Sequence, residues 1–146
     1  MELIAFIALV ALGYFAGSLA ERKHYASIES REEALLHLPS VTIRKVEDEG
    51  QVEKAQLVSG NAVISVDYFK RLLAGLRTLV GGRVKTYESL LDRARREAIL
   101  RMKAQDPTAD VIINLRLETS SISKGNQQKS VGTIEALAYG TAIHLK

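Results

Sequence analysis

The sequence predicts an α+β domain preceded by one transmembrane helix. Three observations lead to this fold class: an uncharged apolar run over Leu3–Ala20, an amphipathic helical pattern over Thr86–Gln105, and a period of two over Val111–Thr119. The mean hydropathy of the 146 residues, +0.01, averages these unlike parts. The residues after the apolar run are enough for one small hydrophobic core, so a multi-domain enzyme and a disordered chain are both excluded.

The apolar run predicts a membrane anchor. Fifteen of its 18 residues are apolar, and a helix of that length spans about 27 Å, close to the thickness of the hydrocarbon layer. Arg22 and Lys23 follow the run, while only Glu2 precedes it. Because positive flanks stay in the cytoplasm, we expect a single-pass protein of the bacterial inner membrane with its N-terminus outside and its domain cytoplasmic. The alternatives are a cleaved signal peptide ending in Ser18-Leu19-Ala20 and a buried core helix.

Three regions follow from this interpretation: an anchor at residues 1–23, a helical stalk at 24–40 and a domain at 41–146. Gly13 and Gly17 form a G-x-x-x-G pair, which lets membrane helices pack closely, although glycine is also common in such helices. The stalk helix is expected over His24–Leu38 and to stop at Pro39, because the residue before a proline avoids the helical conformation.

Within the domain, hydrophobic periodicity predicts the remaining elements. Strands are expected first, separated by turns or breaks at Asp48-Glu49-Gly50 and Gly60-Asn61. A short helix should follow from Asp67 to the Gly81-Gly82 pair, and the amphipathic helix should end at Asp106-Pro107. The predicted strands before these helices are 41–47, 51–59 and 62–65.

Two further strands are predicted at the C-terminal end, separated by a polar loop over 120–129. The strand from Val111 to Thr119 alternates strictly, so one of its faces should contact water. The strand over 130–145 places small residues on one face, which leaves room for a helix or a neighbouring subunit to approach closely. These small residues are Gly132, Ala136, Ala138, Gly140 and Ala142.

Charge and cysteine content limit the possible functions. The formal net charge is +3 and both signs are interspersed, so no basic face predicts nucleic-acid binding. The absence of cysteine excludes disulfides, thiolate metal sites and cysteine nucleophiles. No nucleophile-elbow or Ser-His-Asp pattern is present, and Gly81-Gly82-Arg83 lacks the spacing of a phosphate-binding loop. We therefore expect no catalytic residues, no organic cofactor site and no enzyme activity.

Several short motifs resemble those of the YbjQ family, also called UPF0145, which carries the label heavy-metal-binding domain. They are Val58-Ser59-Gly60, Gly81-Gly82-Arg83, Tyr87-Glu88, Ala94-Arg95, Ala109-Asp110-Val111 and Gly140-Thr141-Ala142, and the match runs from about Val41 to Leu145. The resemblance implies a dodecin-like α+β subunit that assembles into a homo-oligomeric ring, typically a pentamer, with a strand barrel covered by helices. Asn61 departs from the family pattern by replacing a glutamate, which removes one acidic metal ligand.

The resemblance implies motif or interface roles for Gly60, Gly81, Gly82, Arg83, Tyr87, Glu88, Asp110, Gly140 and Thr141. Of the three histidines, His144 is the candidate metal ligand, because one histidine per subunit could form a site between subunits. His24 and His37 lie in the predicted stalk. We therefore expect a ring-forming structural or binding protein whose ligand the sequence does not identify. The alternatives are a heavy-metal-binding module with ligands from several subunits and, by analogy with dodecins, a small-molecule carrier.

Overall fold

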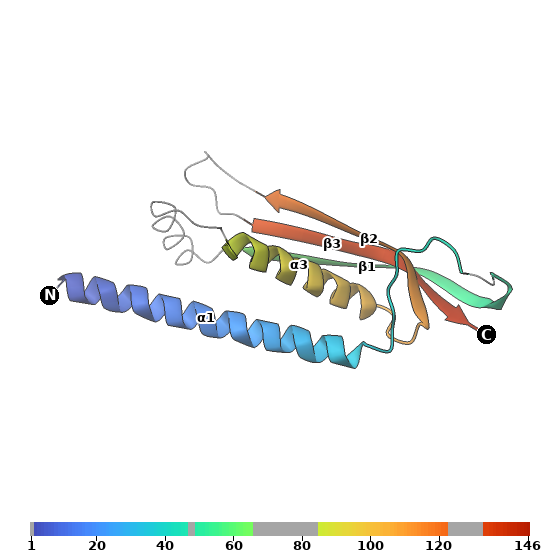
Figure 1. Ribbon diagram of the computed structural model, residues 1–146, viewed down its shortest axis with the longest axis horizontal. Helices are drawn as coiled ribbons and strands as arrows, with labels where there is room; N and C mark the ends of the chain where they lie inside the picture. Colours follow the sequence, from blue (N-terminus) through green and yellow to red (C-terminus); the bar gives the residue numbers. More distant parts are fainter. Residues whose placement is uncertain (1, 47–48, 66–84, 123–132) are drawn as a thin grey trace.

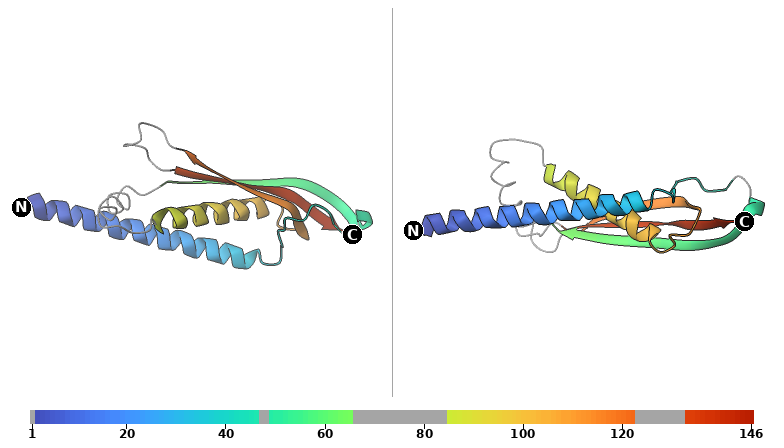
Figure 2. Two further views of the ribbon diagram at one scale, coloured as in Figure 1. Left: turned by 45° about the horizontal axis from the view of Figure 1, so that its top comes forward. Right: turned by 90° about the horizontal axis from the view of Figure 1, so that it is seen from below.

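The computed structural model describes residues 2–46, 49–65, 85–122 and 133–146, arranged in three layers. A three-stranded sheet forms one layer, helix α3 (Lys85–Lys103) covers one of its faces, and helix α1 (Glu2–Ala34) lies on the outer side of α3. Figures 1 and 2 show the N-terminal part of α1 projecting past the start of α3. The predicted α+β class is confirmed.

The sheet is antiparallel and has the strand order β1-β3-β2. The 3-10 turn η1 (Glu49–Gln51) leads into β1 (Val52–Ser65), and β2 (Val111–Ile122) and β3 (Thr133–Leu145) follow α3 in the chain. The central strand β3 pairs Gly140 with Val58 of β1 and Tyr139 with Arg116 of β2. Both β1 and β2 are therefore edge strands within the described part of the chain.

Strand β1 continues through Gly60, where the sequence predicts a break. Glycine is required there for packing and not for a turn: a Cβ at position 60 would lie 2.3 Å from the Ala98 carbonyl oxygen and 2.3 Å from the Met102 nitrogen. The backbone of α3 therefore rests directly on the backbone of β1, as glycine permits. The Gly60-Asn61 pair resembles a turn locally, but this helix contact keeps it in the strand.

The hydrophobic core lies between α3 and the sheet. Ala94, Ala98 and Met102 of α3 are fully buried against the small residues Ala136, Ala138 and Ala142 of β3, which are also fully buried. The sequence allows either a helix or a neighbouring subunit to approach the small-residue face of β3, and in the structure helix α3 covers it. The predicted amphipathic helix over 86–105 is confirmed, with its end at Lys103.

Strand β2 departs from the predicted period of two. Asn114 has a positive φ of 53°, and the register with β3 shifts between Ile113 and Arg116, so a bulge interrupts the alternation. Ile112 and Ile113, which precede the bulge and pair with Ala142 and Thr141 of β3, are both buried. The predicted strand at 41–47 is absent as a named strand; instead the Val41 nitrogen donates to the Ile112 carbonyl and the Asn114 nitrogen to the Ile43 carbonyl.

Helix α1 is one continuous helix, where the sequence predicts an anchor and a separate stalk helix. It runs from Glu2 through Glu21, Arg22 and Lys23 to Ala34, five residues before Pro39. The physical reason is that these charged residues are good helix formers, so nothing interrupts the backbone hydrogen bonds at the end of the apolar run.

Within the part of the chain that the structure describes, no helix combines the length and the apolar composition that crossing a bilayer requires. This finding contradicts the predicted inner-membrane localisation and with it the N-out orientation. The orientation depended on the charges at residues 21–23, but Glu21 lies against the domain, with its carboxylate 3.6 Å from the Arg93 guanidinium. Glu21 is thus part of a helix–helix surface, whereas Arg22 and Lys23 are exposed.

Some predictions fall outside the described residues. They are the short helix from Asp67, the Gly81-Gly82-Arg83 motif, most of the polar loop over 120–129, and Gly132.

Candidate functional site

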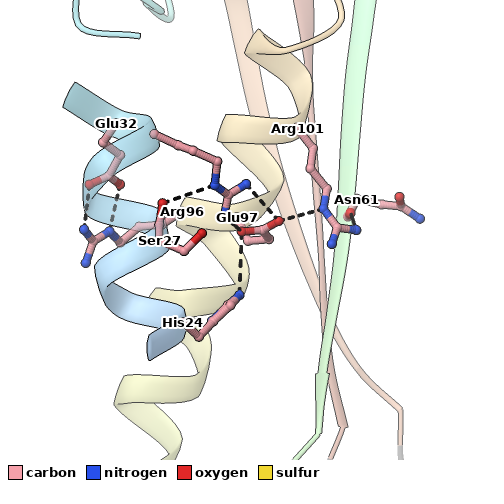
Figure 3. A network of polar contacts seen from close by, with 8 residues as sticks. His24, Ser27, Glu32, Asn61, Arg96, Glu97 and Arg101 are labelled. Carbon is pink, nitrogen blue, oxygen red and sulfur yellow. Dashed lines mark hydrogen bonds and ion pairs between the residues drawn. The ribbon is translucent and has the colours of Figure 1, made fainter. Parts of the chain in front are cut away.

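The polar interface between α1 and α3 is centred on the buried carboxylate of Glu97. Figure 3 shows the side chains that converge on it. Arg31 of α1 donates two hydrogen bonds to this carboxylate, at 3.2 and 2.5 Å, and Arg101 donates a third from the next turn of α3 at 2.8 Å. The Arg31 hydrogen bonds are the main reason why the pKa of Glu97 lies below its usual range. Glu97 is therefore a fixed anion that ties the two helices together.

A second ion pair and an aromatic ring extend this interface. Arg96 donates to both oxygens of Glu32, at 2.8 and 2.6 Å, which lowers the pKa of that carboxyl. The Tyr25 ring lies between α1 and α3, with the guanidinium groups of Arg93 and Arg96 within 6 Å of its centroid, a cation–π arrangement. Ile28 is the fully buried apolar residue in this part of α1. The contact between α1 and α3 is thus mainly ionic.

His24 is the imidazole of this interface whose protonated form is disfavoured. Burial lowers the pKa of its imidazole and the nearby Arg93 lowers it further, while Glu97, 3.7 Å from Nε2, raises it. Its Nδ1 atom is buried and has no hydrogen-bond partner, and the same is true of the Arg93 Nε atom. The imidazole therefore gains little from being charged in this position.

A smaller polar cluster lies where α3 turns into β2. Asp106 is buried, and its carboxylate accepts hydrogen bonds from His144 Nε2 at 2.8 Å and from the Thr108 hydroxyl at 3.1 Å. The His144 hydrogen bond is the main cause of the lowered pKa of Asp106. Next to it, Asp110 accepts from the Leu145 nitrogen at 2.8 Å. These contacts fix the end of β3 against the 106–110 turn.

No group of three or more His, Asp or Glu side chains suited to a metal ion occurs among the described residues. At His144, the Nε2 atom is hydrogen-bonded to Asp106, the one protein partner of the ring among the described residues. His24 and His37 lie elsewhere: His37 places its ring nitrogens 3.1 Å from the Ala34 carbonyl and 3.2 Å from the Pro107 carbonyl. Any metal site at His144 needs further ligands from another subunit or from solvent.

The sheet face opposite α3 is open and partly apolar. Leu57, Val63 and Leu137 are exposed there, at 72%, 56% and 38%. The Tyr139 hydroxyl donates to Glu118 on the same face at 3.0 Å, which raises the pKa of the tyrosine. In the strand register Val63 lies diagonal to Leu137, which is opposite Asn61, whereas Leu57 lies apart from them, opposite Thr141.

The two edges of the sheet differ. On β1, the Ser59 nitrogen donates to the Gln105 side chain at 2.9 Å and the Asn61 carbonyl accepts from Arg101 at 2.9 Å, so α3 shields the middle of this edge. On β2, the segment around Val41 covers the edge up to Leu115. From Arg116 onward, no described backbone group contacts the outer edge of β2.

The structure places the predicted site residues in several unconnected positions. Gly140 and Thr141 lie in β3, Gly60 lies in β1 opposite Ala138, and Asp110 lies directly before β2. Glu88 is exposed in the first turn of α3, which also contains Tyr87. Gly13 and Gly17 are partly exposed in α1. The sequence reasoning missed Glu97 and Asp106 as centres of polar clusters, because their partners are 66 and 38 residues away and no local spacing signals them.

Comparison with known proteins identifies the family. Residues 38–146 match the YbjQ family, whose description reads "Putative heavy-metal-binding". The chain belongs to this family. A UPF0145 protein of Methanococcus maripaludis is 37% identical over 110 residues, which cover 73% of this chain and 92% of that protein. A UPF0145 protein of Photobacterium profundum is 40% identical over 95 residues, 64% of this chain and 85% of that protein.

Among solved structures, the chain is similar to a protein of unknown function of the DUF74 family from Pediococcus pentosaceus. It has a TM-score of 0.43 and 15% sequence identity, and the match covers 75% of this chain and 98% of that one. The family match begins at Leu38, after the end of α1 at Ala34, so the whole of α1 lies outside the YbjQ domain.

Proposed function

We propose that this YbjQ protein is a homo-oligomeric binding module whose subunits join through the strand edges of the sheet. The observation that supports it best is the uncovered outer edge of β2. Because the Leu115 nitrogen faces outward, where it donates to Val41, strand alternation directs the backbone groups of Leu117 and Thr119 outward as well. An uncovered edge of this kind readily accepts another strand.

The geometry of the two edges favours a ring. The β1 and β2 edges lie on opposite sides of β3, so pairing the β2 edge of each subunit with the β1 edge of the next is a head-to-tail arrangement, which closes when the rotation permits. On β1 the pairing would use the parts of the edge on either side of Ser59 and Asn61, whose outward groups are bonded to α3 and Gln105. We propose five subunits, the number that the family resemblance implies. The exposed Leu57, Val63 and Leu137 would be covered as the open faces of successive sheets come together.

Native mass spectrometry of the full chain, with and without Thr119→Pro, tests this proposal. The outward N–H of Thr119 makes no bond to β3, so proline should block strand addition and leave the β2–β3 pairing intact. We expect pentamers for the parent and monomers for the variant, with unchanged circular dichroism. Ser120→Ala, whose backbone faces β3, is the matched control and should assemble normally. A monomeric parent chain, or a Thr119→Pro variant that still forms pentamers, refutes the edge-pairing proposal.

A second candidate function is metal binding at His144, favoured by the contact with Asp106. A carboxylate that accepts from one imidazole nitrogen orients the ring and raises the basicity of the other nitrogen toward a metal. In a ring, each subunit would present one such nitrogen. Lys54 lies opposite His144 in the strand register, and its positive charge opposes a bound cation.

Isothermal titration of the full chain with Zn²⁺ tests this second function. We expect binding that His144→Ala abolishes and that Lys54→Ala strengthens about threefold or more, since a like charge is removed nearby. His37→Ala is the matched control, because His37 contacts the same turn at Pro107 and should leave the affinity unchanged. An affinity that is the same in the parent and in His144→Ala contradicts a metal site at this residue.

A further inference from the structure

The N-terminal half of α1 carries a large apolar surface that the fold leaves exposed. Seven large apolar side chains are between 46% and 71% exposed: Ile4, Ile7, Leu9, Leu12, Tyr14, Phe15 and Leu19. At about 200 Å² for each fully exposed side chain of this size, they present roughly 900 Å² to their surroundings. The partners of a stable protein–protein interface each bury about 800 Å². Ile7 and Tyr14 lie nearer the side that faces α3, and the other five side chains present roughly 670 Å² on the opposite side. The exposed area on that side is therefore close to what a specific interface needs.

The direction of this surface follows from the part of the helix that is docked. Glu21 and Ile28 face α3, and stepping back along the same side of the helix reaches Gly17 and Val10, both only partly exposed. The residues of the opposite side are all exposed. Its residues are spaced alternately three and four apart, and they are Ala5, Ala8, Leu12, Phe15 and Leu19.

This alternating spacing is the a/d pattern of a coiled coil, in which each apolar side chain packs into a hole on an identical helix. The pattern ends at Arg22, so it is confined to the part of α1 that projects past α3. Because residues 3–20 contain no charge, two copies brought together in parallel meet no repulsion between like charges. A second copy of this helix therefore fits the surface in spacing, in area and in charge.

The docked half of α1 holds the apolar half in a fixed position. Glu97 and Glu32 bind Arg31 and Arg96 across the α1–α3 interface, and the helix continues without a break from there to Glu2. Subunits related by a rotation axis would thus present their α1 helices in parallel on the same side of the assembly. Tethering in this way raises the effective concentration of each helix toward its neighbours.

We propose that residues 5–19 of α1 form a parallel coiled coil with the same segment of neighbouring copies of this chain, an interface separate from the strand edges. This inference rests on the proposed oligomer, whose subunits bring the helices together. The coil binds the subunits a second time, through surfaces outside the YbjQ domain.

Single cysteines introduced into the cysteine-free chain test the coil directly. Phe15→Cys lies at a d position and Ile7→Cys at an outer c position, and the two side chains are similarly exposed, at 64% and 58%. After mild oxidation of the full chain, we expect a covalent dimer from Phe15→Cys at least tenfold more abundant than that from Ile7→Cys. Equal cross-linking at both positions means undirected apolar association and overturns the proposal.

The result separates the coil from the ring. Pentamers in native mass spectrometry with no cross-link at position 15 would refute the coil and leave the ring standing. A position-15 cross-link in a parent chain that forms no pentamer would uphold helix pairing and refute the ring. Flotation with phosphatidylcholine–phosphatidylglycerol vesicles, together with loss of the position-15 cross-link, would identify lipid as the occupant of this surface and overturn the coil.

Discussion

Replacing Gly60 with alanine should destabilise the domain by forcing α3 away from β1. The added methyl carbon would lie 2.3 Å from two backbone atoms of α3 and 2.8 Å from a third, the Arg101 carbonyl carbon. Since ordinary contacts begin near 3.4 Å, the helix must retreat by about 1 Å, and a close-packed core resists such a shift. Overpacking of this kind costs about 1–3 kcal/mol, and backbone contacts place Gly60→Ala at the upper end of that range.

A smaller effect opposes this loss. Alanine restricts the unfolded chain more than glycine does, which returns about 0.4–1 kcal/mol. The free energy of unfolding should therefore fall by about 2 kcal/mol, a decrease in Tm of roughly 4–8 °C for a chain of this length. Urea titration followed by circular dichroism measures the change, with Ser59→Ala on the same strand as the control. A loss below about 0.5 kcal/mol would refute the close backbone packing inferred at this position.

Three further predictions concern the polar clusters. Arg31→Ala leaves Glu97 buried with fewer partners, so amide hydrogen exchange in the 21–34 segment of α1 should accelerate about tenfold or more. Arg22→Ala is the control and should change the exchange rates little. Equal exchange rates in the two variants would contradict the ionic docking of α1. Burial holds the folded-state pKa of His24 below 6.5, so the unfolded chain binds the proton first, and stability should fall as the pH drops below 6.5. His24→Gln should remove that part of the decline in stability, whereas the loss of stability below pH 4.5, which follows from the lowered pKa of Glu97, should remain. Tm measured from pH 7 to 4 tests this. An unchanged slope of Tm between pH 6.5 and 5 in the variant would show that His24 does not cause the decline. Finally, His144→Ala should raise the pKa of Asp106 toward its ordinary value in a carbon-detected NMR titration, while His37→Ala should not. If neither change affects the pKa of Asp106, His144 does not stabilise the carboxylate.

The elements that the sequence predicts well are those whose burial pattern is local. Helix α3 and strand β3 each bury one continuous face, so the periods of 3.6 and 2 are visible in the chain. The bulge at Asn114 produces no such local signal, because the apolar residues from Val111 to Leu117 also fit a regular alternating strand. The break predicted at Gly60 is wrong for a related reason: the need for glycine there comes from close packing against Ala98 and Met102, which lie 38 and 42 residues later in the chain.

The candidate site was harder to predict than the fold. His144 was identified as a possible ligand, but its partner Asp106 was assigned to the end of a helix, since Asp-Pro commonly marks one. The sequence places Arg101 four residues after Glu97, and this i,i+4 pair forms, with Arg101 Nε 2.8 Å from the carboxylate of the buried Glu97. Its stronger partner, Arg31, lies on a helix whose docking the sequence does not indicate, because an ionic interface produces no apolar stripe.

The order of the strands has a consequence for how the chain folds. The central strand β3 is made after β1 and β2, and each of these pairs only with β3 within the described sheet. During synthesis, β1, β2 and α3 are therefore made before the strand on which all three pack. The described sheet cannot begin to form until the residues from Thr133 onward have been synthesised. Such delayed long-range pairing slows folding and leaves strand edges open to association with other chains in the meantime. The interval between the synthesis of β2 and that of β3 is thus when this protein is most exposed to aggregation.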